Sequence, residues 1–306
     1  MRVLMVTDFY PPIVGGVEIA VRDLSVELVA RGHSVAVATL RVPGEGDRAT
    51  DDGVSVYRIP GLAQSMAWLY GQSRPWAPPL PDPRVVAALA RVIRAERPDV
   101  VHGHDWLARS VLPLRARAGP AFVVSLHYYT RSCAKKSLVY EESPCSGPGP
   151  VKCLRCAAEH YGSWKGPAVA IGNWAAALAE RRAVDLFLPV SRAAAAGNGL
   201  TSSSLPYEVI PNMVRDVPIE AAMADDPRLP QLPQEPFILF VGNIHRYKGV
   251  DVLLDAYRRL DAPPPLVLIG KPSPAMPVAA PGVTILLDWP HARALGGAAA
   301  PAATTG

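Results

Sequence analysis

Residues 240–257 read FVGNIHRYKGVDVLLDAY, the end of an apolar strand, a glycine turn and the first turns of an amphipathic helix. Gly242 lets the strand end in a sharp turn, and Gly249 opens the helix. Arg246 and Lys248 stand between the two glycines. Because the N-terminus of a helix attracts anions, two cations beside it favour a phosphate site at this strand end. A solvated basic turn would not need both glycines.

Strand-like and helix-like segments alternate on the N-terminal side of this stretch. Strands are predicted at 2–7, 33–39, 54–59, 99–104, 121–127 and 184–190, and helices at about 17–31, 84–96 and 106–118. The strands are short apolar runs without alternation, which is typical of a parallel sheet covered on both faces. The pattern predicts an α/β fold with a complete, doubly wound, Rossmann-like domain over residues 1–195.

The pattern begins again after residue 205. YEVIPN, residues 207–212, leads into a Pro-rich link, after which strands are predicted at 237–241, 266–270 and 283–287, and a helix at about 250–260. We expect a second Rossmann-like domain at 205–290. It stops short of the roughly 100–150 residues that such a domain usually needs, so we expect it to be truncated. Residues 291–306 form a low-complexity tail.

The composition argues against several kinds of partner. The 306 residues carry a net charge of +4 and the basic residues are scattered, so we expect no nucleic-acid partner. No segment approaches the roughly 18 apolar residues of a spanning helix, and the N-terminus does not resemble a signal peptide. We therefore expect a cytoplasmic protein. Residues 61–83 hold Trp68, Tyr70 and Trp76 among prolines and are the candidate for peripheral membrane contact.

A second glycine loop follows the first strand. In DFYPPIVGGVEIAV, residues 8–21, Gly15 and Gly16 end a loop and open a helix. Backbone N–H groups at such a helix start can bind phosphate, although an ordinary tight turn explains the glycines equally well. The loop lacks the G-x-G-x-x-G fingerprint, which disfavours a nicotinamide cofactor.

Histidines stand at the ends of two predicted strands. His127 follows one strand, in VVSLHYYT, and His102, His104 and Asp105 end another, in HGHDW. Ligands of open α/β sheets bind beyond the carboxyl ends of the strands, so His127 is a candidate site residue. A hydrogen-bonded structural histidine is the alternative. We interpret the HGHDW residues as loop-ordering polar groups rather than as a metal site.

All four cysteines lie in an insert at about 128–165 without clear periodicity. They are Cys133, Cys145, Cys153 and Cys156, of which the last two form a C-x-x-C pair. Four thiols have the ligand types of a tetrahedral zinc site. Four free thiols, some of them in the core, are the alternative, and the sequence leaves both open.

Several motifs occur in an order that resembles a known family. They are VTDFYPPIVGGVE, RGHSVAVAT, DVVHGHDW, VVSLH, LPVSR, VIPN and FVGNIHRYKGVDVLLDAY followed by LVLIG. In this order the chain resembles family-4 retaining glycosyltransferases of the GT-B fold, over residues 1 to about 290. The resemblance implies a hexosyltransferase-type enzyme that takes a sugar from a nucleotide diphosphate. It also implies a glycan, lipid-linked or small-molecule acceptor, and no cofactor for catalysis.

The resemblance also implies roles for single residues. The Gly15–Gly16 loop would approach the donor diphosphate, Lys248 would bind it, and His127 would lie near the reacting sugar. The family usually has arginine directly after the glycine of the later strand turn. Asn243 stands there in this chain. That role has therefore either passed to Arg246 or is weakened.

Three further residues, Ser191, Arg192 and Asn212, are expected at the domain junction by the same resemblance. Family members also hold the donor through two glutamates late in the C-terminal domain, whereas the last glutamate of this sequence is Glu235. The expectation is a truncated chain that is inactive alone. The alternatives are a non-catalytic glycan-binding remnant and a GT-B sugar-nucleotide epimerase.

Overall fold

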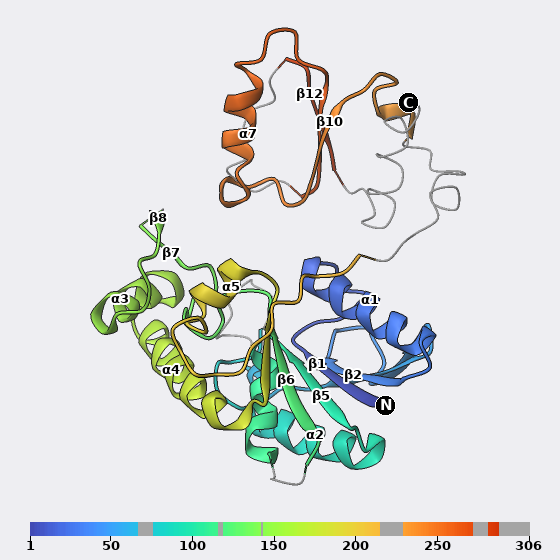
Figure 1. The fold of residues 1–306 in the computed structure, drawn as a ribbon, viewed down its shortest axis with the longest axis vertical. Helices are drawn as coiled ribbons and strands as arrows, with labels where there is room; N and C mark the ends of the chain where they lie inside the picture. Colours follow the sequence, from blue (N-terminus) through green and yellow to red (C-terminus); the bar gives the residue numbers. More distant parts are fainter. Residues whose placement is uncertain (67–75, 116–118, 142, 215–228, 272–280, 288–306) are drawn as a thin grey trace. The chain divides into compact units, whose positions relative to one another are not determined.

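A computed structural model of the chain describes residues 1–66, 76–115, 119–141, 143–214, 229–271 and 281–287 (Figure 1). The chain divides into two compact units, Met1–Arg215 and Asp216–Gly306. The segment 207–212, which was expected near the start of the second domain, belongs to the first unit. Tyr207 forms a single parallel bridge with Phe187, so this segment lies along the edge of the first sheet instead.

The first unit is built on a seven-stranded sheet in the order β3-β4-β2-β1-β5-β6-β9. The strands are β1 (Arg2–Thr7), β2 (Ser34–Leu40), β3 (Arg48–Asp51), β4 (Val54–Ile59), β5 (Val100–His104), β6 (Ala121–Leu126) and β9 (Leu186–Pro189). All neighbours pair in parallel except β3 with β4. The sequence predicted every strand of this sheet but the short antiparallel β3.

Helices cover both faces of this sheet because alternate strand residues point to opposite sides. On β1, Val3 and Met5 belong to one buried cluster, which includes residues of α1 (Gly16–Ala30). Leu4 and Val6 belong to the other, with residues of α2 (Pro83–Glu96) and of the segment Trp106–Leu114. That segment is a 3₁₀ helix within the helix predicted near 106–118, of which residues 116–118 lie outside the described part of the chain. Pro113 inside it cannot donate a backbone hydrogen bond.

The insert is more regular than its sequence predicts. It holds the small hairpin of β7 (Val139–Tyr140) and β8 (Ser143–Pro144), then α3 (Pro150–Tyr161). Next come α4 (Lys165–Ala183) and, after β9, the short α5 (Arg192–Gly197). α3 and α4 meet at Gly166, where a Cβ would lie 2.1 Å from the Ala157 carbonyl oxygen. Only glycine allows this approach of the two helices.

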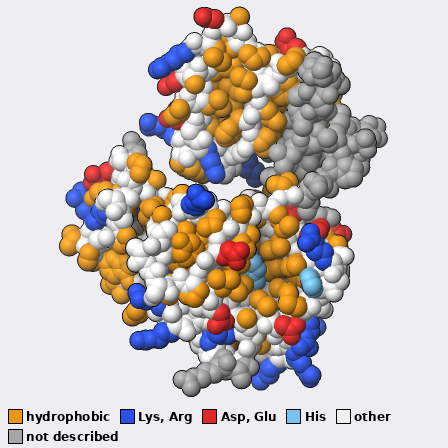
Figure 2. Space-filling model, in the orientation of Figure 1, with side chains coloured by type: hydrophobic (Ala, Val, Ile, Leu, Met, Phe, Trp, Pro, Cys, Tyr) orange, Lys and Arg blue, Asp and Glu red, His pale blue; other side chains and the backbone are white. Residues whose placement is uncertain are grey.

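An apolar stripe is exposed on α4. Trp164, at its N-cap, is 65% exposed, and Ile171 and Leu178 are 55% and 60% exposed. Figure 2 shows apolar side chains over this part of the first unit. Among the described residues, no helix is long and apolar enough to cross a membrane. Of the stretch 61–83, residues 67–75 lie outside the described part of the chain. Trp76 packs edge-on against Phe9, with ring centroids 5.0 Å apart.

The second unit has a parallel sheet in the order β10-β11-β12. Its elements are β10 (Ile238–Val241), α7 (Val250–Tyr257), β11 (Leu266–Ile269) and β12 (Val283–Leu286). All four confirm the sequence-based expectation. Side chains of α7 pack on one face of the sheet, and Leu232 packs on the other. The predicted tail at 291–306 lies outside the described residues.

Candidate active site

Three polar residues follow three neighbouring strands of the first sheet. Asp8 follows β1, Asp105 follows β5 and His127 follows β6. β5 pairs in parallel with both β1 and β6, so the carboxyl ends of the three strands lie side by side. The three residues therefore meet at this end of the sheet, which we call the carboxyl edge. This is where open α/β sheets bind their ligands. His127 was singled out from sequence for this reason, and the same reasoning applies to Asp8, which was missed.

Asp8 is a buried carboxylate at the centre of this edge. One of its oxygens, Oδ1, accepts a hydrogen bond from the backbone N–H of Leu107 at 2.7 Å. The other, Oδ2, lies 3.7 Å from the Nζ of Lys136. Burial raises the pKa of Asp8 to about 7, against the lowering effect of the Lys136 charge, and Asp105 adds to the rise. The carboxyl group therefore changes charge close to neutral pH.

Lys136 comes from the insert and was also missed by sequence reasoning. Its ammonium lies 4.4 Å from the centre of the Trp106 ring and 4.8 Å from that of Trp76. Within the described part of the chain, neither the Lys136 Nζ nor the Asp8 Oδ2 has a hydrogen-bond partner. Both buried groups therefore keep hydrogen-bonding capacity that the described residues do not use.

His127 contacts one of the two histidines of β5 directly. Its Nε2 lies 3.0 Å from the Nδ1 of His104, and His102 Nε2 contacts Ser125 Oγ at 2.8 Å. Burial lowers the pKa of His127 to about 4, so the ring is neutral at pH 7. His102 and His104 are buried at the end of β5. No group of three or more His, Cys, Asp or Glu among the described residues stands ready to hold a metal.

Asn212 lies beside His127. The Asn212 side chain is close enough to His127 to act against the lowering of its pKa by burial. The segment before Asn212 runs along β9, where Ile210 N–H donates to the Pro189 carbonyl at 3.1 Å. Asn212 thus joins the site within the first unit. Ser191 caps α5 by accepting from Ala194 N–H at 3.0 Å, and Arg192 is exposed beside it.

A carboxylate stands at the Gly15–Gly16 loop. Gly15 is the N-cap of α1, and a Cβ added to it would lie 2.3 Å from Oε2 of Glu18. Glu18 is buried, and burial, together with the nearby Glu18 charge, raises the pKa of Asp105 against the lowering effect of Lys136. Asp105 has φ 57° and ψ −163°, a backbone region that side chains rarely adopt. The helix start predicted to bind phosphate is therefore occupied by a side-chain anion of the chain itself.

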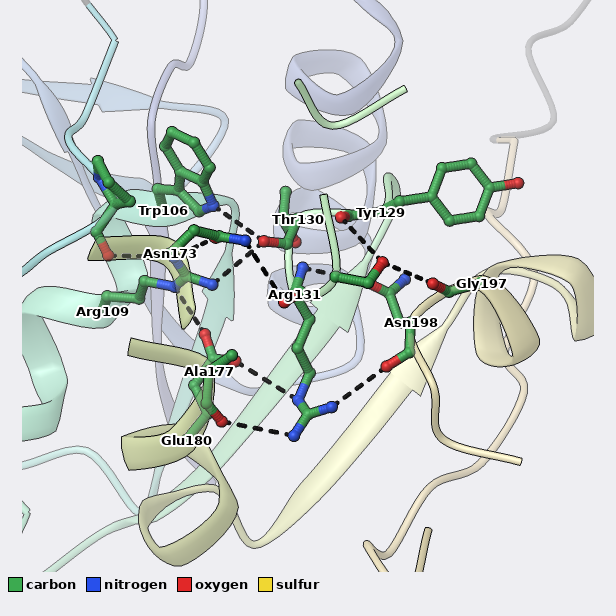
Figure 3. A network of polar contacts seen from close by, with 12 residues as sticks. Trp106, Arg109, Tyr129, Thr130, Arg131, Asn173, Ala177, Glu180, Gly197 and Asn198 are labelled. Atoms are coloured by element: carbon green, nitrogen blue, oxygen red, sulfur yellow. Dashed lines mark hydrogen bonds and ion pairs between the residues drawn. The ribbon is translucent and has the colours of Figure 1, made fainter. Parts of the chain in front are cut away.

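A buried network fixes the segment after His127 (Figure 3). Arg109 donates from Nε to Glu180 at 2.7 Å, from Nη1 to Asn173 at 2.8 Å and from Nη2 to the Thr130 carbonyl at 3.2 Å. The Trp106 indole donates to the same carbonyl at 3.2 Å. The side chains of Arg109 and Glu180 are only 3% and 9% exposed. The backbone at Thr130 is thus tied to α4 and to the segment after β5.

Arg131 completes this network. Its backbone N–H donates to Asn198 Oδ1 at 3.1 Å, and its guanidinium lies 3.6 Å from Glu180. Figure 3 shows the Arg109 and Arg131 side chains converging on Glu180 from two sides. Because Lys136 lies five residues further along the same segment, this network also helps to position the Asp8–Lys136 pair.

The basic turn of the second unit has the predicted local structure. Arg246–Lys248 form one turn of 3₁₀ helix, and Gly249 has φ 74° at the start of α7. Arg246 is paired with Asp251, Nε to Oδ2 at 3.2 Å. Lys248 is exposed and has no carboxylate partner among the residues that the structure describes. Of the two cations predicted to bind phosphate, Lys248 is therefore the one whose charge is available to a ligand.

Residues 15–212 match the family described as "Glycosyl transferase 4-like domain". The chain belongs to this glycosyltransferase family. This match begins after Asp8 and includes the other candidate site residues of the first unit. It includes His127, Lys136, the insert with all four cysteines, and Asn212.

Relatives of this glycosyltransferase extend the finding. It is 36% identical over 118 residues to glycogen synthase of Mycobacterium tuberculosis, a stretch that covers 35% of this chain and 28% of the relative. Sucrose-phosphate synthase from Thermosynechococcus elongatus superimposes with a TM-score of 0.59 at 16% identity, over 97% of this chain and 73% of that one. Starch synthase IV from Arabidopsis thaliana, bound to ADP and acarbose, has the same TM-score and identity, over 97% and 76%. The fold is that of GT-B glycosyltransferases.

Proposed function

We propose that the chain is a hexosyltransferase-type glycosyltransferase that moves a sugar from a nucleoside diphosphate to a glycan, lipid-linked or small-molecule hydroxyl. The observation that carries this proposal is the convergence of Asp8, Lys136 and His127 at the carboxyl edge of the first sheet. At these strand ends lie the neutral imidazole of His127 and the Lys136–Asp8 ion pair. The Nζ and Oδ2 atoms of this pair make no hydrogen bond among the described residues. Such groups suit the hydroxyl groups of a sugar.

The basic turn of the second unit supplies the expected donor contact. Lys248 is exposed beside the N-terminus of α7, where the helix dipole favours a phosphate. Lysine binds phosphate as a point charge, and a charged hydrogen bond of this kind stabilises binding by about 1.5–3 kcal/mol. The ADP bound to starch synthase IV supports a nucleoside diphosphate as the ligand class.

His127 orients the reacting hydroxyl in this proposal. Its pKa of about 4 keeps the ring neutral at pH 7, so it offers a hydrogen bond without adding a charge. Holding a reactant in place can lower a barrier by several kcal/mol. The leaving phosphate takes up the acceptor proton, and the sugar keeps its anomeric configuration, as in the family that the sequence resembles.

Product analysis tests this proposal. The chain is incubated with labelled UDP-, ADP- and GDP-hexoses, with and without glycan and lipid-linked acceptors. NMR of the products then gives the anomeric configuration. We expect acceptor-dependent transfer with retention, in place of the inactivity expected from the sequence. Absence of transfer to every acceptor would favour the alternative of a non-catalytic glycan-binding protein. An isomerised sugar nucleotide formed without acceptor, or a product of inverted configuration, would contradict the proposal.

A further inference from the structure

The four cysteines of the insert line one small cavity. Cys133 and Cys145 lie before and after the β7–β8 hairpin, and Cys153 and Cys156 lie one turn apart on α3. All four border a single cavity of about 30 Å³ and are half-buried free thiols. A cavity of this size holds an ion or a single water molecule but no organic ligand.

Some contacts around the cavity suit a thiolate at Cys153. The backbone N–H of Gly149 donates to Cys153 Sγ at 3.3 Å. Lys135 and Lys152 also border the cavity. Backbone N–H groups and lysines beside sulfur stabilise its negative charge.

The segment that carries Cys133 and Cys145 has little regular structure of its own. Lys136, Leu138 and Glu141 have φ values of 64°, 54° and 47°, which side chains rarely adopt. The Lys136 N–H donates to the Cys133 carbonyl at 3.0 Å, and Cys145 N–H donates to the Leu138 carbonyl at 2.8 Å. A link between these cysteines and α3 would therefore also fix the backbone at Lys136.

We propose that Cys133, Cys145, Cys153 and Cys156 bind one zinc ion as thiolates and so anchor the segment 129–149 to α3. Each thiol that binds loses its proton to solvent, and no electrons are exchanged. Zinc is favoured because it takes four sulfur ligands in a tetrahedral arrangement at about 2.3 Å. The four side chains face one cavity but do not yet stand at ligand distances among the described residues, so binding draws them inward.

The cysteine site is separate from the candidate active site at Asp8 and His127, and it acts on that site through Lys136. Zinc holds the Cys133 end of the turn that places Lys136 beside Asp8. The proposed role is structural, and it does not depend on which sugar or acceptor the chain uses.

Metal analysis of the 306-residue chain tests the proposal. The protein is purified without chelator in reducing buffer, and its zinc is measured by mass spectrometry of the elements. We expect about one zinc per chain, and thiols that react with a colorimetric reagent only when a chelator removes the metal. Cobalt(II) in place of zinc should give the visible bands of a tetrahedral thiolate complex.

Two variants and a control sharpen this test. Cys153→Ser and Cys133→Ser should each lose most of the zinc, whereas Ser146→Ala, next to Cys145, should keep it. A chelator should also open residues 129–149 to protease while the first sheet stays folded. Metal-free protein with four freely reactive thiols, or with cysteines joined in disulfides after purification under reducing conditions, would overturn the proposal.

Discussion

The Lys136 ammonium lies 3.7 Å from the Asp8 carboxylate, where an irregular insert meets the end of the first strand. Asp8 is fully buried and the Lys136 side chain is 15% exposed, between the rings of Trp76 and Trp106. A buried pair of this kind is a weak source of stability, because both charges lose their hydration. It is better explained as a prepared arrangement for a polar ligand, as the proposed function requires.

Lys136→Gln should destabilise the protein in a pH-dependent way. The pKa of Asp8 in the folded state is about 7, against 3.8 when exposed. At pH 5.5 Asp8 is therefore mostly protonated and the loss of the cation costs little. At pH 8.5 the variant must bury an unpaired carboxylate or protonate it. Protonating at pH 8.5 a group whose pKa in the wild type is about 7 costs about 2 kcal/mol, and we expect a loss of about that size. Urea unfolding at the two pH values measures the difference.

Lys135→Gln is the matched control for this prediction. Lys135 is the neighbouring residue, and its Nζ contacts the Val139 carbonyl at 3.4 Å rather than a carboxylate. Its effect on unfolding should be the same at both pH values. A Lys136→Gln variant equally destabilised at pH 5.5 and 8.5 would show that Asp8 does not titrate in this range.

Glu180→Gln should destabilise the first unit strongly. The change leaves the guanidinium groups of Arg109 and Arg131 in the buried network without their shared negative charge. Removing one partner of a buried pair costs about 3–5 kcal/mol. The control is Glu159→Gln, which breaks the exposed pair with Arg155 and should leave the unfolding midpoint nearly unchanged. Equal effects of the two variants would mean that the network is dispensable.

Much of the fold could be predicted from sequence because the strands are parallel and buried on both faces. Such strands are continuous apolar runs, as in RVLMVT and AFVVSL. α4 was missed because its sequence, KGPAVAIGNWAAALAERRA, is rich in alanine and has little contrast between its faces. α3 was missed because cysteines and charged residues interrupt its period.

Only part of the candidate site could be predicted from the sequence. A histidine after a parallel strand is a recognisable signal, and it identified His127. Asp8 carries the same signal and was overlooked. Lys136 has none, because only the fold of the insert brings it to Asp8. Two other side-chain contacts could not be predicted from sequence spacing alone. Arg246 pairs with Asp251, and the Glu18 carboxylate lies beside Gly15.

Glu18→Gln should open the start of α1 to anions. The Glu18 carboxylate stands beside Gly15 at the N-terminus of that helix, where it excludes phosphate by its charge. A charge at a helix terminus is typically worth about 0.3–1 kcal/mol and up to about 2 kcal/mol when partly buried. Pyrophosphate should therefore bind the variant a few-fold to about thirtyfold more tightly, with an effect that falls as salt rises. Unchanged pyrophosphate affinity would count against an anion site at this loop.

His127→Ala should lower sugar transfer far more than nucleotide affinity. The ring orients the acceptor side of the reaction in our account, and a misplaced reactant can cost about a hundredfold in rate. His33→Ala is the control. His33 precedes β2 and therefore lies at the N-terminal end of the parallel strands, opposite the candidate site. Steady-state kinetics combined with nucleotide titration separates the two effects. A variant that loses nucleotide binding but keeps its turnover per bound donor would contradict this role.

Titration calorimetry of the 306-residue chain with UDP and with ADP tests the central claim, that this protein binds the diphosphate of a sugar donor. We predict one binding site for a nucleoside diphosphate, weakened at least tenfold in Lys248→Ala, since a charged hydrogen bond is worth about 1.5–3 kcal/mol. Lys152→Ala, which removes a lysine of the insert, should leave the affinity unchanged. Absence of binding to either nucleotide, or equal affinity in the wild type and in Lys248→Ala, would contradict the account.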